Sequence, residues 1–193
     1  MNAIGTNLKD AYLITNSKFG DDRGFFMESF VLKEFQKILT YDVEFVQDNH
    51  SKSSRGVLRG LHYQIQNPQG KLVRCISGAV FDVIVDLRKS SPTFGKWYGV
   101  ELNRSNLQLW VPPGFAHGFY TLTETAEFLY KTTDYYYPEY EISLLWNDRN
   151  LNIDWGNNSD PILSEKDLNG KTFEECDKYE LSLIHISEPT RPE

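Results

Sequence analysis

Three polar side chains with complementary chemistry lie close together in an otherwise apolar, strand-like part of the sequence. Arg59 and His62 belong to the block RGLHYQ, and Lys71 begins a later apolar stretch. A histidine accepts a proton near neutral pH, and a nearby cation stabilises negative charge on an oxygen. A single histidine in a strand is more often structural, but cations are costly to bury without a ligand or partner. The cluster therefore predicts proton abstraction from a carbon, with charge gathering on a neighbouring oxygen.

Gly60 decides whether Arg59 and His62 serve the same site. Strict strand alternation would direct these two side chains to opposite faces. A glycine permits a β-bulge, which would bring both side chains to one face. In the alternative arrangement Arg59 points to solvent, and only His62 and Gln64 line the cavity.

A second histidine, His117, lies in the block PPGFAHGF. Pro112, Gly114 and His117 match the PxGxxH part of the second cupin motif, whose histidine often binds a metal. The first cupin motif would supply two histidines one residue apart and a glutamate, but this chain has LHYQ around His62. Fewer than three suitable ligands remain, so the sequence predicts no metal site. We hypothesise that Asp82 orients His117.

Tyrosines near the end of the β-rich region offer functional alternatives to core packing. Aromatic residues in strands most often belong to the core. The hydroxyl of Tyr130 can instead deliver a proton to the face of a carbanion opposite the base. An exposed ring, such as Tyr136 in the run YYY, can stack on a nucleobase. From the residues alone both interpretations stay open.

Short apolar runs separated by Gly, Pro, Asn and Ser occupy most of residues 47–146. In residues 79–87 the alternation predicts one apolar core face, with Val83 and Val85, and one mixed face, with Asp82. Regularly spaced short strands favour a β-sandwich or barrel. We therefore predict an all-β fold with strands at residues 71–76, 79–87, 97–102, 108–111, 118–121, 127–134 and 142–146.

Helices are predicted only at the margins of this region. Residues 31–39 have the apolar spacing of an amphipathic helix that covers a sheet from outside. Ser164, followed by an acidic first turn, has the form of an N-cap. We therefore expect a second short helix to begin there.

Length and composition indicate one globular domain. The chain has 193 residues, 40% of them hydrophobic, with no internal repeat or linker. We predict that residues 1–180 form a single unit. Residues 181–193 (LSLIHISEPTRPE) lack the periodicity of the strands and resemble a vector-derived or flexible tail.

Charge and cysteine content exclude several classes of protein. A net charge of -7 argues against sequence-independent binding to nucleic acid or an anionic membrane, which requires a basic face. Cys75 and Cys176 have neither a disulfide-framework nor a zinc-finger spacing. No apolar run approaches the roughly 20 residues of a membrane helix, and no signal peptide is recognisable. We expect a cytoplasmic protein.

Ordered sequence blocks extend from about Ala11 to Asp167, and together they are far more specific than any one alone. The blocks are DRGFF with Glu28, QDNHS, RGLHYQ, KLV, DLR with SPTFG, PGFAHGF and SEKD. They resemble the dTDP-4-dehydrorhamnose 3,5-epimerase family. The resemblance implies a cupin-like jelly roll with a few short peripheral helices, a homodimer, and an isomerase without metal or organic cofactor.

The resemblance also implies a reaction. Family members invert C3 and C5 of dTDP-4-dehydro-6-deoxy-D-glucose to give dTDP-4-dehydro-L-rhamnose, for dTDP-L-rhamnose biosynthesis. His62 corresponds to the base, and Asp167 corresponds to the carboxylate that orients it. Lys71 corresponds to the lysine that stabilises the enolate, and Tyr130 to the proton donor on the opposite face.

Further positions correspond to ligand contacts of the family. Arg23 and Arg59 match residues that meet the diphosphate, and Tyr136 matches the aromatic residue that stacks on thymine. The remaining positions are Glu28, Gln47, Asn49, His117, Glu141 and Lys166.

Three other functions remain open at this point. An epimerase that acts at C3 alone or at C5 alone would share the fold and most of the blocks. A non-catalytic sugar-nucleotide-binding module would tolerate loss of His62 or Tyr130, both of which are present. A metal-dependent cupin oxygenase would contain bound iron or manganese.

Overall fold

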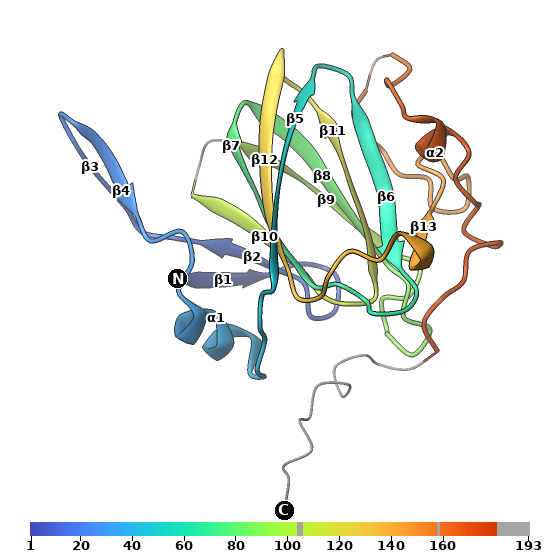
Figure 1. The fold of residues 1–193 in the computed structure, drawn as a ribbon, viewed down its shortest axis with the longest axis horizontal. Helices are drawn as coiled ribbons and strands as arrows, with labels where there is room; N and C mark the ends of the chain where they lie inside the picture. Colours follow the sequence, from blue (N-terminus) through green and yellow to red (C-terminus); the bar gives the residue numbers. More distant parts are fainter. Residues whose placement is uncertain (104–105, 158, 181–193) are drawn as a thin grey trace, which may run out of the picture.

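Two antiparallel β-sheets face each other in the computed structural model, which describes residues 1–103, 106–157 and 159–180 (Figure 1). Consecutive strands often lie in different sheets, as in a jelly roll, and the predicted all-β class is confirmed. Within the described residues, one sheet has the order β1 (Asn2–Gly5), β2 (Tyr12–Thr15), β10 (Leu107–Val111), β7 (Lys71–Ser77), β12 (Thr125–Thr132) and β5 (Gln47–Ser54). The other has the order β13 (Glu141–Ser143), β6 (Leu58–Gln64), β11 (Phe115–Thr121), β8 (Ala79–Asp86) and β9 (Trp97–Asn103).

The predicted strands all occur, with shifted ends. The strand expected at residues 142–146 is shorter and begins earlier, as β13. In contrast, β1 to β4 at the N-terminus were not predicted. β1, β3 and all but the last residue of β4 are exposed, so they lack the alternation between buried and exposed positions that identifies a half-buried strand.

The prediction of a single core face for β8 is wrong, because both faces of this strand are buried. Val80 and Ile84 belong to the core between the two sheets. Val83 and Val85 pack on the opposite face in a second cluster, together with Trp155 from the C-terminal segment. The polar-looking chain after β13 thus covers the outer face of the five-stranded sheet. The mixed face of β8 therefore points into the interior of the molecule.

Both predicted helices occur. α1 (Leu32–Leu39) buries Phe35 and Leu39 in a cluster with Trp110 of β10, so it covers the six-stranded sheet from outside as predicted. α2 (Glu165–Leu168) begins after Ser164, whose hydroxyl accepts a hydrogen bond from the Asp167 backbone amide at 3.2 Å. A 3-10 helix, η1 (Pro138–Tyr140), precedes β13.

The predicted bulge at Gly60 is confirmed. His62 pairs with His117 and Arg59 pairs with Phe119, so two residues of β6 oppose one residue of β11. Gly60 has φ +112, and a Cβ atom there would lie 2.6 Å from the Gly118 Cα atom. Only glycine fits this close crossing of two backbones. The bulge lets Arg59 and His62 line the same cavity.

A β-hairpin formed by β3 (Lys18–Asp21) and β4 (Gly24–Met27) projects from the body of the molecule (Figure 1). Phe19, Phe25 and Phe26 are 66%, 62% and 68% exposed on it. Among the described residues, no helix is long and apolar enough to cross a membrane. The predicted tail at residues 181–193 lies outside the described part of the chain.

Candidate active site

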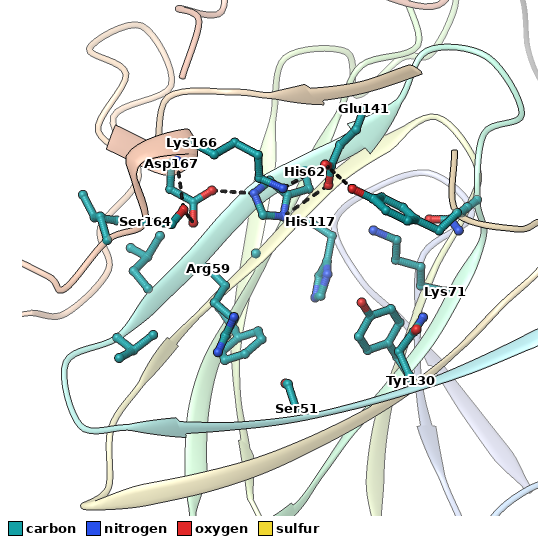
Figure 2. Close-up of a pocket in the computed structure, with 18 of the residues that line it drawn as sticks. Ser51, Arg59, His62, Lys71, His117, Tyr130, Glu141, Ser164, Lys166 and Asp167 are labelled. Carbon is teal, nitrogen blue, oxygen red and sulfur yellow. Dashed lines mark hydrogen bonds and ion pairs between the residues drawn. The ribbon is translucent and has the colours of Figure 1, made fainter. Parts of the chain in front are cut away.

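A cavity of about 750 Å³ opens between the two sheets, within the size range of small-molecule sites. His62 from β6, Lys71 from β7 and Tyr130 from β12 all line it, and Figure 2 shows their side chains directed toward a common space. Strands of both sheets and the segment that leads into α2 therefore build one site. Its other predicted members are Gln47, Asn49, Arg59, His117, Tyr136, Glu141, Lys166 and Asp167.

His62 is held by a carboxylate far away in the sequence. Its Nε2 atom lies 2.5 Å from Asp167 Oδ1, and its Nδ1 atom lies 3.9 Å from Glu141 Oε1 (Figure 2). The Ser164 hydroxyl donates a hydrogen bond to the other oxygen of Asp167 at 2.9 Å. A carboxylate bonded to one ring nitrogen fixes the tautomer and stabilises the imidazolium that forms after proton capture.

The two carboxylates beside His62 stay ionised. Burial alone would raise the pKa of Asp167, but hydrogen bonds and charge from His62, with Ser164, leave the pKa below its ordinary value. For Glu141, burial is likewise outweighed by the hydrogen bond from Lys166 and the charge of His62, so its pKa is also lowered. Both groups can therefore stabilise a positively charged His62.

Lys71 is a buried cation at the floor of the cavity, with 8% of its surface exposed. Among the described residues, no carboxylate forms an ion pair with it, although the charges of Glu141 and Asp82 act on it from a distance. Burial lowers the pKa of the Lys71 ammonium from 10.5 to about 8. A desolvated ammonium without a fixed partner is well suited to meet a developing oxyanion.

Tyr130 lies beside Lys71, whose Nζ atom is 6.0 Å from the centre of the Tyr130 ring. Burial raises the pKa of the Tyr130 phenol, and the charge of Glu141 acts in the same direction. The phenol therefore keeps its proton near neutral pH. In this form it can donate a proton or a hydrogen bond.

His117 and Asp82 form a second histidine–carboxylate pair, and the predicted contact between them is confirmed. His117 Nε2 lies 2.9 Å from Asp82 Oδ2, and Asp82 is fully buried. Burial outweighs the opposing influence of His117 and raises the pKa of Asp82. His117 on β11 pairs with His62 on β6, and both residues line the cavity.

The remaining polar groups make smaller networks around the rim. Arg59 donates from Nε to the Ser53 hydroxyl at 3.0 Å, and the end of its guanidinium group makes no hydrogen bond to any other described residue, so it can meet a ligand. Glu141 accepts hydrogen bonds from Lys166 at 2.8 Å and from the Tyr136 hydroxyl at 2.9 Å. Gln47 and Asn49 bond each other at 2.9 Å.

Arg23 and Glu28 do not reach this cavity from within their own chain. Arg23 lies in the turn of the projecting hairpin, where 90% of its side chain is exposed and it pairs with Asp21. Glu28 follows β4 and is exposed. Neither residue lines the cavity.

Sequence reasoning missed Ser51, Gln69 and Ser164, which also line the cavity. Strand alternation contained the signal for one of them, because Ser51 continues the row begun by Gln47 and Asn49 on one face of β5. Gln69 lies before β7, outside any strand, so alternation does not place it. Ser164 was identified only as a helix cap.

Among the described residues, no group of three or more His, Cys, Asp and Glu side chains is arranged to hold a metal ion. His62 and His117 each bond a carboxylate through Nε2.

Similarity to known proteins identifies the family of this chain. The family model described as dTDP-4-dehydrorhamnose 3,5-epimerase matches residues 5–175. The dTDP-4-dehydrorhamnose 3,5-epimerases of Shigella flexneri and Pseudomonas aeruginosa are 55% and 56% identical, each over 93% of this chain and 99% of the relative. The crystal structure of a dTDP-6-deoxy-D-glucose-3,5-epimerase from Legionella pneumophila in complex with dTDP-4-keto-L-rhamnose matches with a TM-score of 0.91 and 48% identity, over 94% of this chain and 98% of that chain. This chain therefore belongs to the dTDP-4-dehydrorhamnose 3,5-epimerase family.

Proposed function

We propose that this protein converts dTDP-4-dehydro-6-deoxy-D-glucose into dTDP-4-dehydro-L-rhamnose by inverting C3 and C5, a step of dTDP-L-rhamnose biosynthesis. The observation that carries this proposal is the convergence of His62, Lys71 and Tyr130 on one cavity. A base, a cation and a protonated phenol around one space are what an epimerisation beside a ketone needs. Family membership supplies the identity of the substrate.

Each inversion is a proton removal followed by proton delivery to the opposite face. His62 takes the proton from the carbon beside the C4 ketone, and Asp167 stabilises the resulting imidazolium. The electron pair of the broken C–H bond moves into the ring, and its charge gathers on the C4 oxygen beside the Lys71 ammonium. Tyr130 then gives its proton to the other face of the same carbon, which inverts it.

One set of residues can serve both carbons because C3 and C5 flank the same ketone. Removal of either proton places negative charge on the C4 oxygen. Lys71 is the one buried lysine among the described residues and it lines the cavity, so it can stabilise both enolates. The base needs access to both carbons, which a small shift of the sugar provides.

The nucleotide half of the substrate requires polar and aromatic contacts. We assign the diphosphate to Arg59, whose forked guanidinium group is free beyond its bond to Ser53. We assign the thymine to Tyr136, which is 49% exposed at the cavity rim. Gln47, Asn49, His117, Glu141 and Lys166 are further proposed substrate contacts.

Solvent isotope incorporation tests the double inversion. The purified protein is incubated with the keto-sugar in deuterated water, and the product is examined by NMR. We expect deuterium at both C3 and C5, because each carbon receives its new proton from a group that exchanges with solvent. Label at only one of the two carbons would instead establish a single-site epimerase. No label at either carbon would favour a non-catalytic binding module.

We also expect turnover to need no metal or organic cofactor. Dialysis against a chelator followed by elemental analysis provides the check. Loss of activity that iron or manganese restores would contradict this expectation and support the oxygenase class.

The pH dependence should follow the state of Lys71. Because its pKa is about 8, the ammonium is present below this pH and lost above it. We expect kcat/KM, which reports the free enzyme, to fall about tenfold per pH unit above this value. A kcat/KM profile that stays flat to pH 10 would contradict the assignment.

A homodimer would explain where Arg23 and Glu28 act. Both correspond to ligand contacts of the family, yet both lie outside the cavity of their own chain. Arg23 lies in the turn of the projecting hairpin, which carries exposed phenylalanines, and Glu28 follows this hairpin. We infer that the hairpin reaches the cavity of a second copy. A mixture of the inactive variants Arg23→Ala and His62→Ala should then regain part of the activity, because each mixed dimer contains one complete site. No recovery after subunit exchange would refute the shared site.

Two further proposals concern the extent of the catalytic domain and the compartment in which the enzyme works. We propose that residues 1–180 form the single catalytic domain, since strands from Asn2 to Ser143 and the C-terminal segment share the clusters around the cavity. We place the enzyme in the cytoplasm because nucleotide sugars are built from nucleoside triphosphates, which are cytoplasmic.

A further inference from the structure

Ser51 lines the cavity and carries a hydroxyl that makes no hydrogen bond with any of the described residues. Ser51 is on β5 and lines the cavity, and its Oγ atom is shielded from solvent. Within the part of the chain that the structure describes, this atom has no hydrogen-bond partner. A buried hydroxyl that stays unpaired is costly, and serine is seldom placed in that situation without a reason. Ser51 is therefore poised to bond a ligand.

The position of Ser51 along β5 indicates which part of the substrate it meets. Asn49 pairs with Tyr130 on the neighbouring strand, which marks the level of the reacting carbons. Ser53 bonds Arg59, which marks the level of the diphosphate. Ser51 is two residues from each, about 7 Å along the strand in either direction. In Figure 2 its side chain likewise lies between Arg59 and Tyr130.

A hexose attached to a diphosphate has a fixed order of carbons. C1 carries the diphosphate, C2 carries a hydroxyl, C3 is one of the two reacting carbons, and C4 is the ketone. On the path from C1 to C3, the C2 hydroxyl is thus the sugar group that lies between the diphosphate and a reacting carbon. It also keeps its configuration throughout the reaction, so one fixed protein group can bond it from substrate to product.

We propose that the Ser51 hydroxyl bonds the C2 hydroxyl of the sugar and makes the enzyme selective for substrates that carry it. This inference rests on the proposed function. Ser51 is a specificity-determining residue rather than an acid or base, because it holds the ring at a carbon that does not react. A bond at C2 keeps C3 in register with His62 and Tyr130, so its loss should affect kcat as well as KM.

The test crosses a protein change with a substrate change. Wild type and Ser51→Ala are each assayed with the normal keto-sugar and with its 2-deoxy analogue. Wild type should lose about tenfold in kcat/KM on the 2-deoxy analogue, and Ser51→Ala should lose about tenfold on the normal substrate. Combining the two changes should cause little further loss, because each removes the same hydrogen bond.

Thr121→Val is the matched control. The Thr121 hydroxyl on β11 is also buried and unpartnered among the described residues, but Thr121 does not line the cavity. Its replacement should leave kcat/KM unchanged on both substrates. The melting temperature of Ser51→Ala should be no lower than that of wild type, because the substitution removes a buried hydroxyl that makes no hydrogen bond among the described residues of the free protein.

The inference is overturned if Ser51→Ala keeps the wild-type preference for the normal substrate over the 2-deoxy analogue. It is also overturned if Ser51→Ala is as active as wild type. Failure of the proposed function has a different signature, because wild type itself would then neither turn over the normal keto-sugar nor exchange its protons.

Discussion

His62→Ala should abolish turnover and solvent exchange at both C3 and C5 while leaving dTDP binding largely intact. The imidazole is the proposed base for both carbons, and Asp167 at 2.5 Å holds it in place. Loss of a general base typically costs 10²–10⁴-fold in rate, and the proposed scheme assigns proton removal at both carbons to His62. We therefore expect the rate to fall by about 10³-fold or more. Deuterium incorporation measures the exchange, and calorimetry with dTDP measures the binding.

His50→Ala provides the matched control. His50 lies on β5, in the six-stranded sheet rather than in the sheet that carries His62, and there it is exposed and pairs with Glu127 at 3.0 Å. Its removal should change neither turnover nor dTDP affinity. Retained turnover in His62→Ala would falsify the assignment of the base. A loss of dTDP binding equal to the loss of rate would show that His62 acts mainly through binding.

Strand alternation explains how much of the site is readable from sequence. The row Gln47, Asn49 and Ser51 lies on one face of β5, and Lys71 opens β7. Gly60 predicted the bulge that brings Arg59 and His62 together. These features depend only on the local backbone, so the two-residue periodicity of strands and the position of a glycine predict them.

The contact between His62 and Asp167 could not be derived from local pattern. The two residues are 105 positions apart, and their contact depends on how α2 docks against β6. Only resemblance to the family connected them in advance. The same limitation explains the wrong prediction for β8, because nothing in its own residues indicates that Trp155 and its neighbours return to cover the second face.

The position of Arg23 outside the cavity of its own chain could not be predicted from the sequence for a related reason. A sequence resemblance assigns a residue to a site, but it does not say which copy of the chain supplies it. The projecting hairpin carries Arg23 away from the cavity of its own chain. A contact between subunits leaves no periodic signal in a single sequence.

Lys71→Met should lower kcat by about 10²–10³-fold, the usual effect of removing one group that stabilises an oxyanion. Methionine keeps much of the length and the apolar stem of lysine but lacks the ammonium. The charge matters most when the enolate forms, so KM should change much less than kcat. Steady-state kinetics measures both. Lys131→Met is the control, since Lys131 pairs with Asp48 at 3.0 Å and does not line the cavity.

The same substitution should stabilise the free enzyme. The pKa of Lys71 is lower in the folded protein, at about 8, than its ordinary 10.5, so folding disfavours the charged form. This penalty is fully present below pH 8 and disappears as the pH rises toward 10.5; it amounts to about 3 kcal/mol. Removing the ammonium relieves the penalty, so Lys71→Met should melt at higher temperature than wild type at pH 7 and at a similar temperature above pH 10. A variant that is both inactive and less stable at pH 7 would mean that Lys71 holds the fold together, whereas lost activity with gained stability identifies a charge kept for catalysis alone.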